Sequence, residues 1–188
     1  MPSERLEYQL ETIDEFFRRL GMSQQGSLIL RFLATFARFE YALKRTGYIV
    51  PNQNECKPHW TGFASKCDVA FQSVDVEGLP LAKVYLEELP PEILKVVDGI
   101  PTWSAGPTPY PRGSLKYHSI MVRRVRNNLF HGEKTSVFID AAGKSSGARV
   151  IKEPSRNEAL LSYSLVILEA FLLCDLKVRQ KFLDYIPS

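Results

Sequence analysis

The sequence predicts a mainly helical fold, and two observations lead to this prediction. The chain has 188 residues, of which 45% are hydrophobic and 24% charged, so it is long enough to form one domain with a sizeable core. Several long segments have apolar residues at steps of three and four, the period of an amphipathic helix. We therefore expect a single domain over 1–188, with its helical core at about 4–48 and 114–178 and an irregular insertion at about 51–113.

Two amphipathic helices are predicted before the insertion, at about residues 4–20 and 27–45. Ser27 is a suitable N-cap for the second helix, and Gly47 is a suitable end. The apolar stripes of the two helices consist of Leu6, Leu10, Ile13, Phe17 and Leu20, and of Leu28, Phe32, Phe36, Phe39 and Leu43.

The insertion is rich in proline. Nine of the twelve prolines lie between Pro51 and Pro111, and proline lacks the N–H that a helix interior needs. We expect short helices at about 60–71 and 81–97. The segment 99–113 contains four prolines, and we predict that it is a loop.

Regular structure is predicted to resume near residue 114. A third amphipathic helix covers about 114–130 and ends near Gly132. Short runs with β-branched residues at 135–140 and 148–152 predict a small hairpin. A final helix that begins at Pro154 is apolar on almost all sides. Such a helix lies at the centre of a bundle or is covered by a partner chain.

Positive charge is concentrated around the third of these helices. The whole chain has a formal net charge of only +3, too small to predict a general nucleic-acid-binding protein. From 112 to 134, six cations face one acid, a local net charge of +5, so the rest of the chain sums to −2. Such local charge favours a phosphate site, although a basic helix face is more often only solvated. The six cations are Arg112, Lys116, Arg123, Arg124, Arg126 and Lys134.

The sequence also indicates a location. Its three cysteines cannot all pair within the chain, and a domain of this size needs no disulfide, which favours the reducing cytoplasm. The amino terminus is charged where a signal peptide is apolar, and Glu169 interrupts the most apolar stretch. We therefore expect neither a signal peptide nor a membrane span.

The basic helix ends in residues suited to RNA cleavage. On an ideal helix, Arg126 and His131 are separated by about 140° and about 7.5 Å of rise, whereas Asn127 and His131 are four apart and share a face. An arginine side chain is long enough to bend back, so one phosphodiester could lie between Arg126 and His131. His131 could take a proton from the ribose 2′-hydroxyl or return one to the leaving oxygen, and Arg126 could clamp the phosphate. Asn127 could orient the imidazole of His131 or the phosphate.

This chemistry needs no metal, and its nucleophile is the 2′-hydroxyl of the RNA, so DNA is not cut by the same route. Auxiliary phosphate contacts are predicted for Arg123, Arg124 and Lys134. No cofactor is predicted.

The segment Arg126-Asn-Asn-Leu-Phe-His131 resembles the R-N-x-x-x-H form of the R-x4-6-H motif of the HEPN superfamily. The resemblance covers about 4–48 and 114–178. It implies an all-α bundle of four or five helices and a symmetric homodimer, with the two motif-bearing helices facing each other to form one composite ribonuclease site. It also implies a toxin or defence setting. Some toxin members carry a tyrosine that their antitoxin modifies with AMP, but Glu133 occupies that position here, which puts this regulation in doubt.

Other residues have two readings. Glu40 could pair with Arg123 or Arg126 and hold the guanidinium in place, but an i,i+4 contact with Lys44 is the more frequent arrangement. His118 lies on the apolar edge of the third helix, where a histidine is more often packed than catalytic. Four aromatic residues could stack unpaired bases or, more often, anchor the insertion to the core. They are Trp60, Trp103, Tyr110 and Tyr117.

A metal site is not predicted. Cys56, His59 and Cys67 provide only three ligands and lack the paired spacing of structural zinc sites.

The sequence thus predicts a metal-independent cytoplasmic endoribonuclease that acts on RNA as a homodimer. One alternative is a non-catalytic HEPN-like module that binds RNA, a nucleotide or a protein. Another is a toxin that is inactive until an antitoxin or a phage component releases it.

Overall fold

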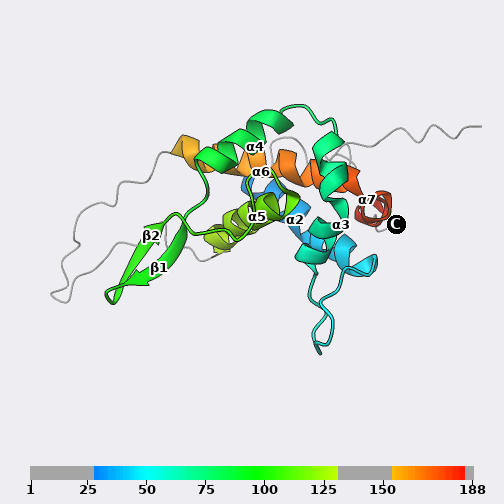
Figure 1. Cartoon of the computed structure of the whole chain (residues 1–188), viewed down its shortest axis with the longest axis horizontal. Coiled ribbons are helices and arrows are strands. Elements are labelled where there is room, and N and C mark those ends of the chain that lie inside the picture. Colours follow the sequence, from blue (N-terminus) through cyan, green and yellow to red (C-terminus); the bar gives the residue numbers. More distant parts are fainter. Residues whose placement is uncertain (1–27, 131–153, 185–188) are drawn as a thin grey trace, which may run out of the picture.

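The computed structural model describes residues 28–130 and 154–184, and this part of the chain is predominantly helical, as predicted (Figure 1). Its one hairpin is formed by β1 (Ile93–Val97) and β2 (Ile100–Ser104). The helices in chain order are α2 (Leu28–Arg45), α3 (Trp60–Ser73), α4 (Leu79–Glu88), α5 (Leu115–Phe130), α6 (Pro154–Cys174) and α7 (Leu176–Leu183).

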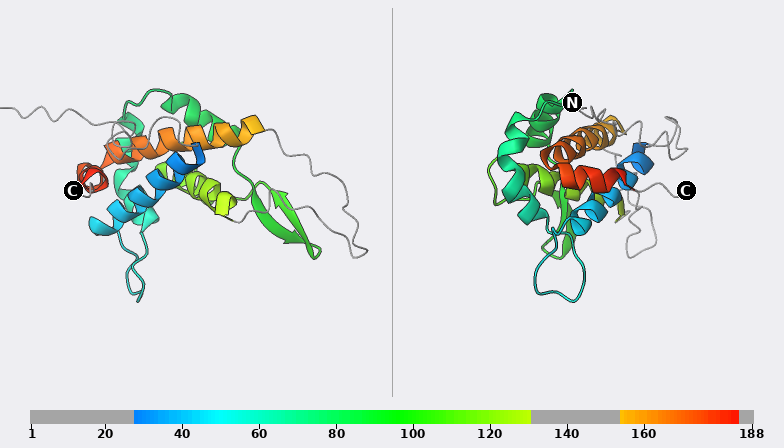
Figure 2. Two further views of the ribbon diagram at one scale, coloured as in Figure 1. Left: turned by 180° about the vertical axis from the view of Figure 1, so that it is seen from behind. Right: turned by 90° about the vertical axis from the view of Figure 1, so that its right-hand side faces the viewer.

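Helix α6 lies at the centre of the fold and packs against α2, α3, α4, α5 and α7, as the views from three sides show (Figures 1 and 2). By length and composition alone, the segment Arg156–Cys174 could cross a membrane, a test that core helices of soluble proteins also pass. Here its neighbours are the other helices of the chain, which agrees with the predicted central helix of a bundle. Its buried side chains are Leu160, Leu161, Ser164, Ile167, Leu168, Ala170, Phe171 and Leu172.

Aromatic rings from three helices meet in the interior. The ring of Phe171 on α6 lies 5.9 Å from Phe39 of α2 and 6.1 Å and 5.5 Å from Phe63 and Phe71 of α3, centroid to centroid. All four rings are fully buried. Because burying one such side chain contributes about 1.5–3 kcal/mol, this cluster is a principal source of the stability that joins α2, α3 and α6.

Residues 51–113 are not an irregular insertion. The short helix predicted at 60–71 is confirmed as α3, which packs against α5 and α6, and α4 packs against α6. The chain between α2 and α5 therefore supplies two helices of the core. The proline content led to the prediction of irregular structure, but most of these prolines lie between the helices rather than within them.

The predicted helix at 81–97 and the predicted loop at 99–113 are wrong in part. Helix α4 ends at Glu88, before Pro90-Pro91, and the chain then forms β1 and β2. The two strands are joined by Asp98 and Gly99, which have φ angles of 51° and 79°. Positive φ at both positions is typical of a type I′ turn, which matches the twist of a two-stranded hairpin.

The remaining helix predictions are confirmed with small changes. The helices expected at 27–45 and 114–130 are α2 and α5. The final helix ends at Cys174, and α7 follows as a separate helix because Asp175 accepts hydrogen bonds from the N–H groups of Lys177 and Val178. The helix predicted at 4–20 and the hairpin predicted at 135–152 lie outside the described residues.

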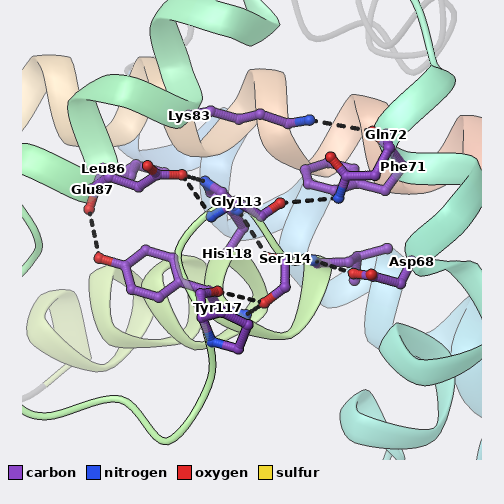
Figure 3. A network of polar contacts seen from close by, with 12 residues as sticks. Asp68, Phe71, Gln72, Lys83, Leu86, Glu87, Gly113, Ser114, Tyr117 and His118 are labelled. Carbon is purple, nitrogen blue, oxygen red and sulfur yellow. Dashed lines mark hydrogen bonds and ion pairs between the residues drawn. The ribbon is translucent and has the colours of Figure 1, made fainter.

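Polar groups from α3 and α4 fix the first turn of α5 (Figure 3). Asp68 Oδ1 accepts a hydrogen bond from Leu115 N at 2.7 Å, and Glu87 Oε1 accepts one from Gly113 N at 2.8 Å. Ser114 Oγ accepts from the backbone N–H three residues later, which is an ordinary N-cap. Because N–H groups at a helix start lack partners within the helix, these contacts set where α5 begins.

Loss of the Asp68 carboxylate is expected to destabilise the protein. Asp68→Ala removes the acceptor for Leu115 N and should lower the free energy of unfolding by about 0.5–2 kcal/mol, as measured by urea denaturation. Asp68→Asn is the matched control, because its amide oxygen can still accept the bond. An equal loss in both variants would contradict the role assigned to this hydrogen bond.

Candidate functional site

Two arginines of α5 lie over aromatic rings of α2 and α3. The Arg126 guanidinium carbon is 5.3 Å from the centroid of the Phe36 ring, and that of Arg123 is 6.0 Å from the Trp60 ring. The rings of Phe36 and Trp60 are stacked on each other at 5.3 Å. Both arginines therefore lie within cation–π range of one aromatic layer, which we call the aromatic floor (Phe36 and Trp60).

Glu40 holds the aromatic floor rather than an arginine. Trp60 Nε1 donates a hydrogen bond to Glu40 Oε1 at 2.9 Å, and Trp60 is only 4% exposed. A buried indole N–H needs such an acceptor. In the structure this bond takes the place of the predicted contacts of Glu40 with Arg123, Arg126 or Lys44. Glu40 thus acts on Arg123 indirectly, through the ring on which that arginine lies.

Asn127 lies beside the Arg126 guanidinium. Arg126 Nη1 donates a hydrogen bond to Asn127 Oδ1 at 2.9 Å, and the asparagine side chain is exposed. Arg126 was predicted to clamp the phosphate and Asn127 to orient the imidazole or the phosphate, and the structure brings the two side chains into direct contact. The Phe36 ring and Asn127 Oδ1 therefore both help to orient the guanidinium.

Arg124 has a different environment from its neighbours. Its Nη1 and Nη2 donate to the backbone oxygens of Gly106 and Pro107 at 3.0 Å and 2.7 Å, and burial lowers its pKa. A Cβ on Gly106 would lie 2.6 Å from Ile93 Cδ1 and 2.9 Å from Arg124 Nη2, so a larger residue would displace these side-chain ends. The guanidinium fastens the segment after β2 to α5, which does not favour the predicted phosphate contact of Arg124.

The other half of the predicted motif lies outside the described residues. His131 follows Phe130, the last residue of α5, directly in the sequence. Lys134 and Glu133 also lie beyond the described part of α5. The structure therefore positions Arg123, Arg126 and Asn127, and the role of His131 stays a prediction from the sequence.

His118 is packed in the core, as its position on the apolar edge indicated. Its ring contacts Phe71 and Tyr117 at centroid distances of 5.6 Å and 5.4 Å. Its Nδ1 lies 3.0 Å from Ser114 O. A carbonyl can only accept, so Nδ1 carries the proton and donates. This leaves Nε2 to face Glu87 Oε1 at 3.4 Å.

Two opposing effects act on the pKa of His118. Burial is the larger and lowers it, because the ring is fully buried and charge is poorly solvated there. The hydrogen bond with Ser114 O and the charge of Glu87 favour the charged form, but each has a smaller influence on the pKa than burial. His118 is therefore neutral at physiological pH and is a structural residue of α5.

The remaining candidates are anchors rather than surface groups. Tyr117 is buried and its hydroxyl lies 3.4 Å from Leu86 O. Tyr110 packs against the core and lies within 5.4 Å of Lys116 Nζ, and Trp103 is half-buried on β2.

The two cysteines of the rejected zinc site have different environments, because Cys56 is exposed whereas Cys67 is buried on α3. Within 28–130 and 154–184, no group of three or more His, Cys, Asp or Glu side chains is arranged to hold a metal ion.

Comparison with protein families, with curated proteins and with solved structures finds no match to this chain. The case for a function therefore rests on the residues themselves.

The hydrogen bond between Glu40 and Trp60 is expected to matter for stability. Glu40→Ala leaves the buried indole N–H unpaired, which should cost about 1–3 kcal/mol of unfolding free energy in a denaturant titration. Glu40→Gln keeps an acceptor and should cost less. If both variants match the wild type, the aromatic floor does not depend on Glu40.

Acidification is expected to destabilise the protein through His118. Its pKa is lower in the folded than in the unfolded protein, so the unfolded chain binds more protons below pH 6.5. Stability should therefore fall as the pH drops from 7.5 to 5.5, by at most about 1.4 kcal/mol per pH unit from this group.

His118→Asn keeps a donor near Nδ1 but cannot titrate, so its unfolding free energy should depend less on pH than that of the wild type. An unaltered slope in His118→Asn would contradict the assignment.

Proposed function

We propose that this chain is a metal-independent endoribonuclease, in which Arg126 clamps the scissile phosphate and His131 transfers protons. One observation carries the proposal. The Arg126 guanidinium is held at the surface by Phe36 and Asn127, and it belongs to the segment Arg126-Asn-Asn-Leu-Phe-His131 that resembles the HEPN motif.

An oriented guanidinium suits phosphoryl chemistry. Arginine is always charged and presents parallel N–H donors that fit two phosphate oxygens. Catalysis benefits when such donors are in place before charge develops, because the protein then spends no free energy on reorganisation. Contacts with the ring of Phe36 and the oxygen of Asn127 provide this orientation at Arg126. In the proposal Arg123, whose guanidinium lies over the Trp60 ring, contacts a neighbouring phosphate.

In the proposed reaction the ribose 2′-oxygen attacks the adjacent phosphorus and the bond from phosphorus to the 5′-oxygen breaks. One imidazole accepts the 2′-hydroxyl proton, and a protonated imidazole returns a proton to the leaving 5′-oxygen. The products carry 2′,3′-cyclic phosphate and 5′-hydroxyl ends. Neither a metal ion nor a cofactor is part of this scheme.

The proposal includes a homodimer. Each chain has a single candidate histidine for this chemistry, His131, whereas the reaction uses one base and one acid. Two copies that face each other across the motif-bearing helices would supply both groups. A cytoplasmic toxin or defence role, with RNA as the substrate and an antitoxin protein as regulator, completes the proposal.

Replacing either motif residue is expected to abolish most cleavage. His131→Ala should reduce the cleavage rate of RNA in EDTA by about 10² to 10⁴, the usual range for positioned acid–base catalysis. Arg126→Ala should give a loss of similar order, and Arg126→Lys should recover only part of it because the two-point contact is missing. Products are read by end-group analysis, with an oligonucleotide carrying a single 2′-deoxyribose at the cut position as the substrate control.

Arg45→Ala is the protein control, because Arg45 is an exposed arginine at the C-terminal end of α2, outside the predicted motif. Equal cleavage by wild type and His131→Ala would reject the catalytic assignment. RNA binding that Arg126→Ala weakens, without new RNA ends from the wild type, would instead support the non-catalytic binding module.

A further inference from the structure

The β1–β2 hairpin has two edges that differ chemically. Val97 and Ile100 flank the two-residue turn, and in such a hairpin the flanking pair exchanges hydrogen bonds. Antiparallel pairs alternate, so the next pair, Val96 and Pro101, exchanges none. The backbone groups of such pairs point away from the partner strand. The same holds for the pair two positions further along, formed by Leu94 and Trp103.

Proline closes one of these edges. Pro101 points outward from β2 but has no N–H to offer, which is a common way to protect a strand edge from pairing. The outer edge of β1 has no such block, because Leu94 and Val96 both present an N–H and a C=O outward. Within the described residues, β1 pairs only with β2.

The hairpin is also exposed to solvent at its tip and hydrogen-bonded to α5 and α6 at its base. It projects from the helical body in the views from front and back (Figures 1 and 2), and Val96 and Ile100 are 74% and 64% exposed. At its base, Asn128 of α5 donates to Glu92 O at 2.8 Å, and Arg156 of α6 donates to Pro90 O at 3.2 Å. The residues just before β1 are therefore fixed to α5 and α6, while the outer edge of β1 extends away from the helices.

We propose that the outer edge of β1 binds an extended segment of another protein, which adds to the hairpin as a third strand. Lys95 is placed between Ile93 and Val97 on one face of β1. An added strand fits best when it has an acidic residue opposite Lys95 and apolar residues two positions away on each side. This inference does not depend on the proposed ribonuclease activity.

A second copy of the chain fits this edge poorly. Antiparallel pairing of two β1 strands must use Leu94 and Val96 of both. The register that pairs Leu94 with the second copy's Val96 sets the two Lys95 side chains opposite each other, which is destabilising. A shift one way requires Glu92 O, which already accepts from Asn128. A shift the other way requires Asp98, which lies in the turn.

The test uses two synthetic heptapeptides, Thr-Val-Ser-Glu-Ser-Val-Thr and the same sequence with lysine at the centre. Binding is followed by NMR titration of the ¹⁵N-labelled full chain. The glutamate peptide should perturb the amides of Leu94 and Val96 most, and it should bind at least about fivefold more tightly than the lysine peptide. Lys95→Glu should reverse this preference. No binding, an unchanged preference in Lys95→Glu, or perturbations centred elsewhere would overturn the proposal.

A proline substitution tests the edge itself. Val96→Pro removes an outward N–H but no bond inside the hairpin, so it should abolish binding while contacts between Lys95 and Thr102 persist in NOE spectra. Pro101→Val is the control and should leave binding to β1 intact. Peptide binding that survives Val96→Pro while the hairpin stays intact would overturn the proposal. A dimer of the chain in sedimentation experiments that Val96→Pro dissociates and Pro101→Val does not would also overturn it.

Discussion

The placement of α5 is the constraint on which both surfaces of this protein depend. Its apolar side is buried against the core, and its first turn is fixed by carboxylates of α3 and α4. Because the start of α5 is fixed, its polar residues lie on two sides of the helix, one over the aromatic floor and one beside the hairpin. Arg123 and Arg126 lie over the aromatic floor, while Arg124 and Asn128, four residues apart and thus on one face, hold the hairpin side. A rotation of α5 would disturb both surfaces together.

The period of apolar residues was enough to predict α2 and α5, because their stripes are long and regular, whereas α6 was predicted from a long run that is apolar on almost all sides. It failed between α4 and α5, where β1 and β2 are short and proline occurs at Pro90, Pro91 and Pro101. Pro101 is compatible with a strand only at a position that makes no hydrogen bond within the hairpin, and that position is fixed by the turn at Asp98-Gly99. The turn residues Asp98-Gly99 can be read from the sequence, but whether Pro101 fits a strand depends on how the two strands pair.

Sequence reasoning also could not separate the arginines of α5 by role. Arg123, Arg124 and Arg126 are chemically identical and lie within four residues, so charge alone assigned all three to phosphate. Tertiary contacts divide them, because the oxygens of Gly106 and Pro107 engage Arg124 while rings lie beneath the other two. The link from Glu40 to Trp60 was equally hidden, since the two residues are 20 positions apart on different helices.

This division changes how the positive charge of the segment should be understood. The local net charge of +5 suggests a broad basic surface, but Arg124 is engaged with backbone carbonyls and Lys116 lies near the Tyr110 ring. Among the described residues, Arg123 and Arg126 lie over aromatic rings. A broad basic surface binds RNA by releasing many counterions, so its affinity falls steeply with salt. Guanidiniums that are held over aromatic rings instead suit recognition of one or two phosphates, as the proposed cleavage of a single phosphodiester bond would need.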